Sequence, residues 1–234
     1  MGLEFFDESR KLIDKIEQNE SENIKKAAQL VAESIMNGGV LQAFGGGHSF
    51  AGAMELAGRA GGLIPTTTIN DPSRGEYERI EGIGTFLMNK VNIDPNDVFV
   101  LISNSGRNPQ LIEMAQYIKE KGNELIVVTS LEVSKEATSR HSSGKKLYEF
   151  ADVVLNNYSN HGDAVLSIEG FDSKVSGTST VGVVVLLQQM NYEAIKIMVE
   201  AGFNPPVYKS VNVDGGPEHN ADFENKYAHR IYKF

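Results

Sequence analysis

The sequence predicts an α/β protein in which a parallel sheet is covered by helices on both faces. Short apolar segments at residues 40–44, 97–103 and 124–129 alternate with segments whose apolar residues recur at helical spacing. The segments DVFVLIS and ELIVVT are apolar at almost every position, which is typical of strands buried on both faces. Alternation of such strands with helices favours a parallel sheet between two helical layers.

The chain begins with a long helical pattern at residues 3–36. The polar segment 18–23 is expected to separate two helices there, with Ser21 as a cap. Such an arm before the first strand packs either on a partner subunit or on its own sheet, and the pattern leaves both open.

The remaining elements follow in order along one domain without repeats or linkers. The expected strands are 40–44, 63–68, 97–103, 124–129 and 152–155, with a possible sixth at 164–169; the expected helices are 51–60, 80–89, 109–121, 178–201 and a short one near 221–232. Residues 130–146 are interpreted as a long polar loop or an irregular helix. The single domain, 1–234, divides into N-terminal helices at 1–37, a core at 38–201 and a tail at 202–234.

The strongest functional signal is the loop SNSGRN, which joins the strand at 97–103 to the helix that begins at Pro109. Such a loop directs backbone N–H groups and the positive end of a helix dipole at one spot, beside the hydroxyls of Ser103 and Ser105. Gly106 allows the backbone to curl there. The pattern suits a phosphate, although an ordinary serine-capped loop gives the same residues.

A second loop, GGGHS at residues 45–49, repeats this organisation after the first strand. It has neither the GxGxxG nor the GxxxxGK[ST] spacing of nucleotide sites. Both loops follow the carboxyl ends of strands, where parallel sheets bind their ligands. We therefore expect them to face the same cleft.

Composition narrows the classes of partner. The 234 residues carry a net charge of −9, with a pI near 5.1, which argues against nucleic acid or an anionic membrane as partner. The chain has no cysteine, lacks a basic and apolar secretory leader, and has no apolar run long enough to span a bilayer. We expect a cytoplasmic protein. No metal site is expected, because no histidine pair has HxH or HxxxH spacing.

The pairing of GGGHS with SNSGRNP resembles the sugar isomerase (SIS) domain family, over roughly residues 20–200. The long N-terminal helices and the tail resemble a phosphosugar-binding branch of that family that is distantly similar to phosphoheptose isomerase. The resemblance implies a three-layer αβα sandwich with a five-stranded parallel sheet, flavodoxin-like or Rossmann-like, here with an N-terminal helical extension. It also implies a homodimer or homotetramer with sites near the interface, and a phosphorylated sugar or amino sugar as ligand, without a cofactor.

The family motif SxSGx[ST] matches Ser103, Ser105 and Gly106, with Asn108 in place of the final hydroxyl residue. Ser49 matches the serine that closes the first loop. The segment 178–201 has no histidine, whereas phosphoheptose isomerases resemble one another in placing a catalytic histidine there. The residues expected to bind phosphate or sugar are Gly46, Gly47, Ser49, Ser103, Asn104, Ser105, Gly106, Asn108 and Ser130.

An aldose–ketose isomerase needs a base, a ring-opening acid and groups that stabilise an enediolate. Glu55 is the candidate base, unless it only pairs with Arg59 at i+4. His48 lies at a helix start beside the expected phosphate, or serves as a simple cap. His141 and His219 are candidate acids, although a lone histidine of this kind is more often a surface residue.

Two hypotheses follow. The first is a sugar-phosphate isomerase, or a related lyase or etherase that acts through an enediolate or an elimination. The second is a phosphosugar sensor without turnover that acts on a partner. The absence of a basic DNA-binding extension argues against a stand-alone transcription regulator.

Overall fold

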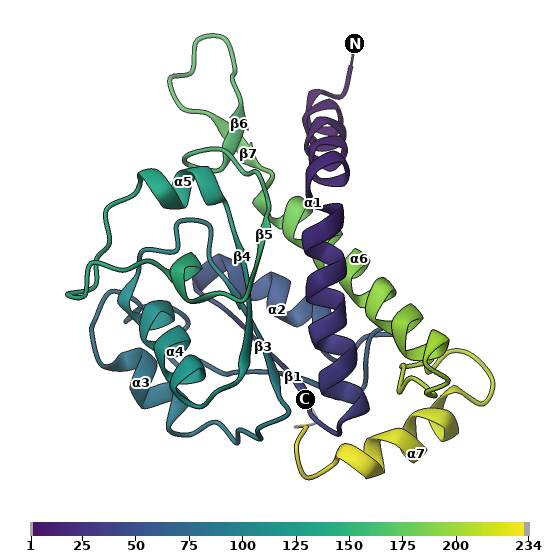
Figure 1. The fold of residues 1–234 in the computed structure, drawn as a ribbon. Coiled ribbons are helices and arrows are strands. Elements are labelled where there is room, and N and C mark those ends of the chain that lie inside the picture. Colours follow the sequence, from purple (N-terminus) through teal and green to yellow (C-terminus); the bar gives the residue numbers. More distant parts are fainter. Residues whose placement is uncertain (1, 232–234) are drawn as a thin grey trace.

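A computed structural model describes residues 2–231 and shows a five-stranded parallel sheet between two layers of helices (Figure 1). The strand order is β2-β1-β3-β4-β5, and every neighbouring pair is parallel. The strands are β1 (Leu41–Gly45), β2 (Thr66–Thr68), β3 (Val98–Ile102), β4 (Glu124–Thr129) and β5 (Val153–Asn156). The predicted fold class is confirmed.

Seven α-helices and two 3₁₀ turns complete the part of the chain that the structure describes. They are α1 (Glu4–Met36), η1 (Gly47–Ser49), α2 (Phe50–Leu56), α3 (Ile83–Met88), α4 (Pro109–Glu120), α5 (Leu131–Glu136), η2 (Leu147–Phe150), α6 (Ser179–Glu200) and α7 (Gly216–Tyr227). Helices α1, α2 and α6 cover one face of the sheet, and α3 and α4 cover the other.

Alternating side chains of each central strand supply both cores, which explains why the strands are apolar at almost every position. In β3, Val98, Val100 and Ile102 pack under α1, α2 and α6, whereas Phe99 and Leu101 pack under α4. All five are essentially inaccessible to water. A strand between two apolar layers has no solvent side, so it has no polar alternation.

Helix α1 is continuous, so the prediction of two helices separated at residues 18–23 was wrong. The polar segment faces inward at Glu20, which is only 3% exposed. Its carboxylate accepts hydrogen bonds from the hydroxyl of Tyr158 (2.8 Å) and the amide of Asn156 (3.2 Å) at the end of β5. These bonds satisfy the buried charge, and Ser21 lies inside the helix rather than at its start. The helix packs along α6 of its own chain (Figure 1).

Four other elements differ from the expected ones. The expected sixth strand forms a separate antiparallel hairpin instead, β6 (Ala164–Leu166) with β7 (Val175–Gly177), which projects from the top of Figure 1. Strand β2 is shorter than expected, and Leu63 instead forms an isolated antiparallel bridge with Val207 of the tail. Helix α2 ends at Leu56, not at residue 60, and α7 begins at Gly216, earlier than expected. The expected end of that last helix, Tyr232, lies outside the described residues.

Within residues 2–231, none of the helices combines the length and the apolar character that crossing a membrane requires.

Candidate functional site

The two loops predicted to bind ligand lie side by side at the carboxyl edge of the sheet. Strand β1 has β2 on one side and β3 on the other, so the chain reverses its direction of travel across the sheet at β1. Gly45, at the end of β1, is paired with Ile102, at the end of β3, and the amide of Gly46 donates to the carbonyl of Ile102 (3.3 Å). This is the position at which open parallel sheets form their binding crevice.

The first loop turns so tightly that its first residue must be glycine. A Cβ atom on Gly45 would lie 2.2 Å from the carbonyl oxygen of Ser49, a distance that no side chain tolerates. The turn leads through η1 into α2. His48 is exposed on this turn, and Ser49 is half-buried with no capping hydrogen bond from its side chain.

The second loop, residues 103–108, contains backbone N–H groups that have no hydrogen-bond acceptor in the described part of the chain. Among the described residues, nothing accepts a hydrogen bond from the backbone amides of Asn104, Ser105, Arg107 and Asn108. The amide of Gly106 donates instead to Ser103 Oγ (3.2 Å), and Gly106 itself has a left-handed backbone (φ +54°). The loop opens onto the N-terminus of α4, which no side chain caps. Free amides at a helix N-terminus form an anion-binding nest.

The rest of the second loop is anchored to β4 and β5. The carbonyl of Asn104 accepts from Ser130 N (3.2 Å) and Thr129 Oγ1 (3.0 Å), and its side-chain oxygen accepts from Asn157 Nδ2 (2.6 Å). The hydroxyl of Ser130 donates to the carbonyl of Ser159 (2.6 Å). Asn104 and Ser130 therefore hold the loop, and the hydroxyl proton of Ser130 is already engaged. A direct role of these two side chains in phosphate binding stays a prediction.

Three arginines gather around this loop, and sequence reasoning missed them. Arg140 donates from Nη1 to Asn108 Oδ1 (2.8 Å) and from its amide to the carbonyl of Arg107 (2.9 Å). Desolvation lowers the pKa of Arg140, and the positive charges of Arg107 and Arg79 lower it further, against an opposing effect of Glu78. Arg79 and Arg107 therefore lie close enough to Arg140 to repel its positive charge.

This arginine cluster (Arg79, Arg107 and Arg140) is not neutralised by ion pairs. Across residues 2–231, no carboxylate lies within ion-pair distance of any of the three, and Arg107 Nε is buried without a hydrogen-bond partner. In a chain with a net charge of −9, positive charge is thus concentrated beside the free amides. Such a region suits an anion. Arg107 lies within the predicted loop, but Arg79 and Arg140 come from separate segments, so no local sequence pattern indicated the cluster.

Glu78 is a carboxylate that lies close to both loops. Its Oε2 lies 3.3 Å from the position that a Cβ atom would take on Gly46, and its backbone carbonyl accepts from Gln110 N (3.2 Å) in the first turn of α4. Within the described part of the chain, its side chain forms neither a hydrogen bond nor an ion pair. The sequence placed Glu78 in a loop without a motif, which is why it was not selected.

The predicted base, Glu55, is engaged elsewhere. It forms an ion pair with Arg59, one turn further along the chain, and accepts from Gln188 Nε2 of α6 (2.9 Å). It does not line the pocket described below. The structure therefore shows the i,i+4 pair that the sequence left open as the alternative, and a catalytic role for Glu55 stays a prediction.

The two candidate acids, His141 and His219, lie at opposite ends of the parallel strands. His141 is largely buried near the arginine cluster, with Nε2 3.8 Å from Glu113 Oε1 and Nδ1 2.7 Å from Ser143 Oγ. His219 lies on α7, with Nε2 3.0 Å from the carbonyl of Val207. Helix α7 packs near Val40, at the amino end of β1. Of these two candidates, His141 is the one that lies near the loops within one chain.

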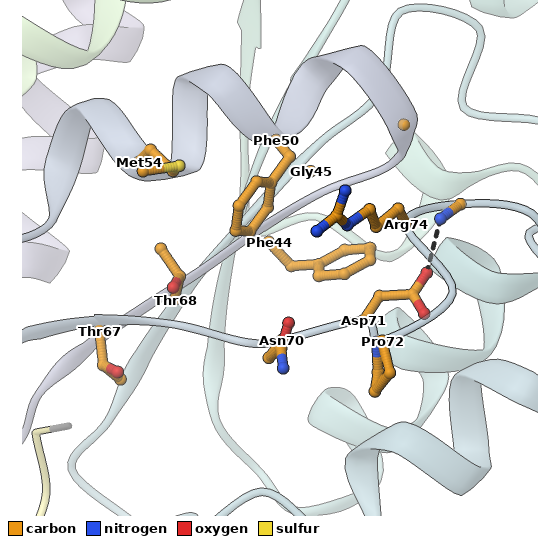
Figure 2. Close-up of a pocket in the computed structure, with 12 residues that line it drawn as sticks. Phe44, Gly45, Phe50, Met54, Thr67, Thr68, Asn70, Asp71, Pro72 and Arg74 are labelled. Atoms are coloured by element: carbon orange, nitrogen blue, oxygen red, sulfur yellow. Dashed lines mark hydrogen bonds between the residues drawn. The ribbon is translucent and has the colours of Figure 1, made fainter. Parts of the chain in front are cut away.

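A pocket of about 990 Å³ opens beside the glycine loop (Figure 2). Phe44, Phe50 and Met54 form an apolar wall from β1 and α2. The opposite side consists of polar residues at and after the end of β2, namely Thr67, Thr68, Asn70, Asp71 and Arg74. This combination of an apolar wall with a few polar groups is typical of sites that bind small molecules.

Asp71 organises the loop on the polar side of the pocket. Its Oδ1 accepts from the amide (2.9 Å) and hydroxyl (2.8 Å) of Ser73, and its Oδ2 accepts from the amide of Gly75 (3.0 Å) and from Gln110 Nε2 (2.9 Å). Burial alone would raise the pKa of Asp71, but the bonds from Gln110, Ser73 and Gly75 together outweigh burial and lower it. The group is ionised at neutral pH and is committed to holding the loop.

This arrangement predicts a pH-dependent stability for the loop. Because the pKa of Asp71 is lower in the folded chain, its contribution is present above the unfolded pKa of 3.8 and is lost as the pH falls through the folded value. We expect Asp71→Asn to lower the melting temperature at pH 7, with the deficit shrinking between about pH 5 and pH 3. A deficit of equal size at both ends of that range would contradict this assignment.

Comparison with known proteins agrees with the fold. A family model of the SIS domain matches residues 4–130. A UPF0309 protein of Listeria monocytogenes is 57% identical over 232 residues, covering 99% of each chain. A UPF0309 protein of a Geobacillus species is 42% identical over 236 residues, covering 97% of this chain and 96% of that one.

Two solved structures share the fold at low sequence identity. The phosphoheptose isomerase from Neisseria gonorrhoeae superposes with a TM-score of 0.56 at 20% identity, over 83% of this chain and 95% of that chain. The sugar isomerase domain of an RpiR transcription factor from Sphaerobacter thermophilus superposes with a TM-score of 0.51 at 16% identity, over 97% of both chains. The SIS model covers more than half of the chain and the UPF0309 similarity spans nearly all of it, so the chain belongs to the SIS domain family and, within it, to the UPF0309 proteins.

Proposed function

We propose that the protein binds a phosphorylated sugar or amino sugar, with the phosphate on the loop of residues 103–108 and the sugar directed toward the pocket beside Gly45 and Gly47. The observation that carries the proposal is the set of four loop amides without acceptors, beside the uncapped start of α4. The hydroxyl of Ser105 and the arginine cluster add donors and positive charge. A dianionic phosphate is the common biological group that satisfies such a set.

We further propose that the protein is an enzyme that moves a proton through an enediolate, either as an aldose–ketose isomerase or as a related elimination enzyme. Glu78 is the carboxylate that the geometry favours as base, because it is unpaired and lies between the glycine loop and the arginine cluster. Free loop amides and guanidinium groups beside it could stabilise negative charge that develops on the substrate. Of the two candidate acids, His141 is the one near the loops, and we propose it for ring opening.

The alternative is a phosphosugar sensor without turnover. It is favoured by the similarity in fold to the sugar isomerase domain of a transcription factor and by the absence of a histidine in α6. Both functions use the same phosphate site, so binding experiments test their common part. We propose the same homodimer or homotetramer, and the same cytoplasmic location, for either one.

The test of the proposal is ligand-induced stabilisation. We expect the melting temperature of the wild-type chain to rise with a sugar phosphate and not with the free sugar, since a ligand that binds only the folded state stabilises it. Ser105→Ala is expected to weaken binding by about 1–3 kcal/mol, because a phosphate oxygen loses a hydrogen-bond donor.

The matched control is Ser173→Ala, which removes an exposed serine from the turn of the β6–β7 hairpin. It should leave the affinity unchanged. Equal affinities of the two variants, or no stabilisation by any hexose, heptose or amino-sugar phosphate, would contradict the proposed site.

A further inference from the structure

The pocket is larger than a monosaccharide ring requires. Its volume of about 990 Å³ lies at the upper end of the range for sites that hold drug-sized ligands. Gly45 and Gly47 line it, and Gly45 is paired with the last residue of β3, directly before Ser103. A ligand whose phosphate lies on the loop of residues 103–108 therefore has room to extend across β1 toward β2.

Arg74 is the one positively charged side chain among the described residues that line the pocket. In Figure 2 its guanidinium group is directed into the space between Phe50 and the loop of Asp71. No carboxylate in the described part of the chain forms an ion pair with it, since both oxygens of Asp71 are occupied by Ser73, Gly75 and Gln110. The pocket thus contains a cation that forms no ion pair with any of the described residues, although the ionised Asp71 lines the same pocket.

The backbone that carries Arg74 is unusual. Its φ of +53° lies in the left-handed region, which a residue with a long side chain rarely adopts. The four hydrogen bonds to Asp71 hold the turn in this conformation, and the next residue, Gly75, packs against Gly47 of the first loop. Backbone strain maintained by such a network is found most often where a side chain is held in position for a ligand.

We propose that Arg74 binds a second anionic group of the ligand, a carboxylate or a second phosphate, at the end of the sugar remote from the first phosphate. This inference rests on the proposed function and narrows its substrate class to sugar phosphates that carry two acidic groups. A guanidinium group matches the two oxygens of either acid in a bidentate geometry, and its charge does not depend on pH in the physiological range. The apolar wall opposite Arg74 excludes water from one side of this contact.

The experiment compares matched ligands by calorimetry. Fructose 1,6-bisphosphate is compared with fructose 6-phosphate, and 6-phosphogluconate with glucose 6-phosphate, so that the added group is a phosphate in one pair and a carboxylate in the other. We expect the wild-type chain to bind the two-anion member of at least one pair about tenfold or more tightly. The pair that shows the preference identifies which acid is recognised.

The variant is Arg74→Gly, which removes the guanidinium group and suits the left-handed backbone, so the fold is expected to survive. It should bring the two affinities of the discriminating pair together while leaving the one-anion ligand unaffected. Lys174→Ala removes one positive charge from the exposed β6–β7 hairpin and should preserve the preference.

The outcomes separate the inference from the proposed function. If one-anion sugar phosphates bind through Ser105 but neither pair shows a preference, the inference is wrong and the proposed function stands. If Arg74→Gly weakens both members of a pair equally, Arg74 binds a group common to both and the inference is also wrong. If no sugar phosphate binds at all, both proposals fail.

Discussion

Glu78→Gln is expected to lower the turnover of a sugar phosphate by about 10²–10⁴-fold, the usual contribution of a general base. Binding should persist and become slightly tighter, because the substitution removes a negative charge beside the arginine cluster. Incorporation of solvent deuterium at C2 of the substrate, followed by NMR, measures the proton transfer directly. The loss of exchange with retained affinity is the expected signature of the base.

Glu55→Gln is the matched control, since it makes the same chemical change on α2. Its carboxylate is bonded to Arg59 and Gln188, so we expect a small loss of stability and little loss of exchange. If Glu55→Gln abolishes exchange and Glu78→Gln does not, the base is Glu55, as the sequence suggested. If both variants retain full binding and the wild-type chain never exchanges the proton, the protein is a sensor.

Asp97→Ala should lower the free energy of unfolding by about 3–5 kcal/mol, because it leaves the buried guanidinium of Arg230 with only the more exposed carboxylate of Asp94, 3.9 Å away. Asp97 is 2% exposed and accepts hydrogen bonds from the amides of Val40 and Asp94, from Gln42 Nε2 and from Arg230 Nη2. It therefore joins the start of β1 to the tail beyond α7. Urea unfolding followed by circular dichroism measures the loss.

The double variant Asp97→Ala/Arg230→Met tests the cause of this loss. Removing the guanidinium of Arg230 as well should restore part of the stability, since the remaining donors to this site are neutral. A loss below about 1 kcal/mol in the single variant, or no recovery in the double variant, would mean that the Asp97–Arg230 pair contributes little.

The fold was predictable because each central strand lies between two apolar layers. That position removes polar alternation from residues 98–102 and 124–129 and makes the strands visible in the sequence. The prediction of secondary structure was wrong where a buried polar side chain has hydrogen-bond partners that are distant in the sequence. Glu20 indicated a break in α1 because its partners, Asn156 and Tyr158, are more than 130 residues away.

The candidate site was predictable where it depends on local backbone geometry. The glycine and serine loops were identified because tight turns and free amides require particular residues in succession. The arginine cluster, Glu78 and Arg74 were not identified, because their roles depend on segments that meet only in the folded chain. His219 was selected from the sequence as a candidate acid, but the sequence does not indicate where its helix packs. Helix α7 packs at the amino ends of the strands, away from the two loops.

The pairing of α1 with α6 and β5 has a consequence for synthesis on the ribosome. The bond between Glu20 and Tyr158 joins residues 138 positions apart, so at about 5–20 residues per second the first helix emerges roughly 7–28 seconds before this partner. During that interval α1 lacks β5 and α6, the elements against which most of its apolar stripe packs. The newborn chain is thus exposed to aggregation at its N-terminus, and the order of synthesis makes closure of this helical layer a late event in folding.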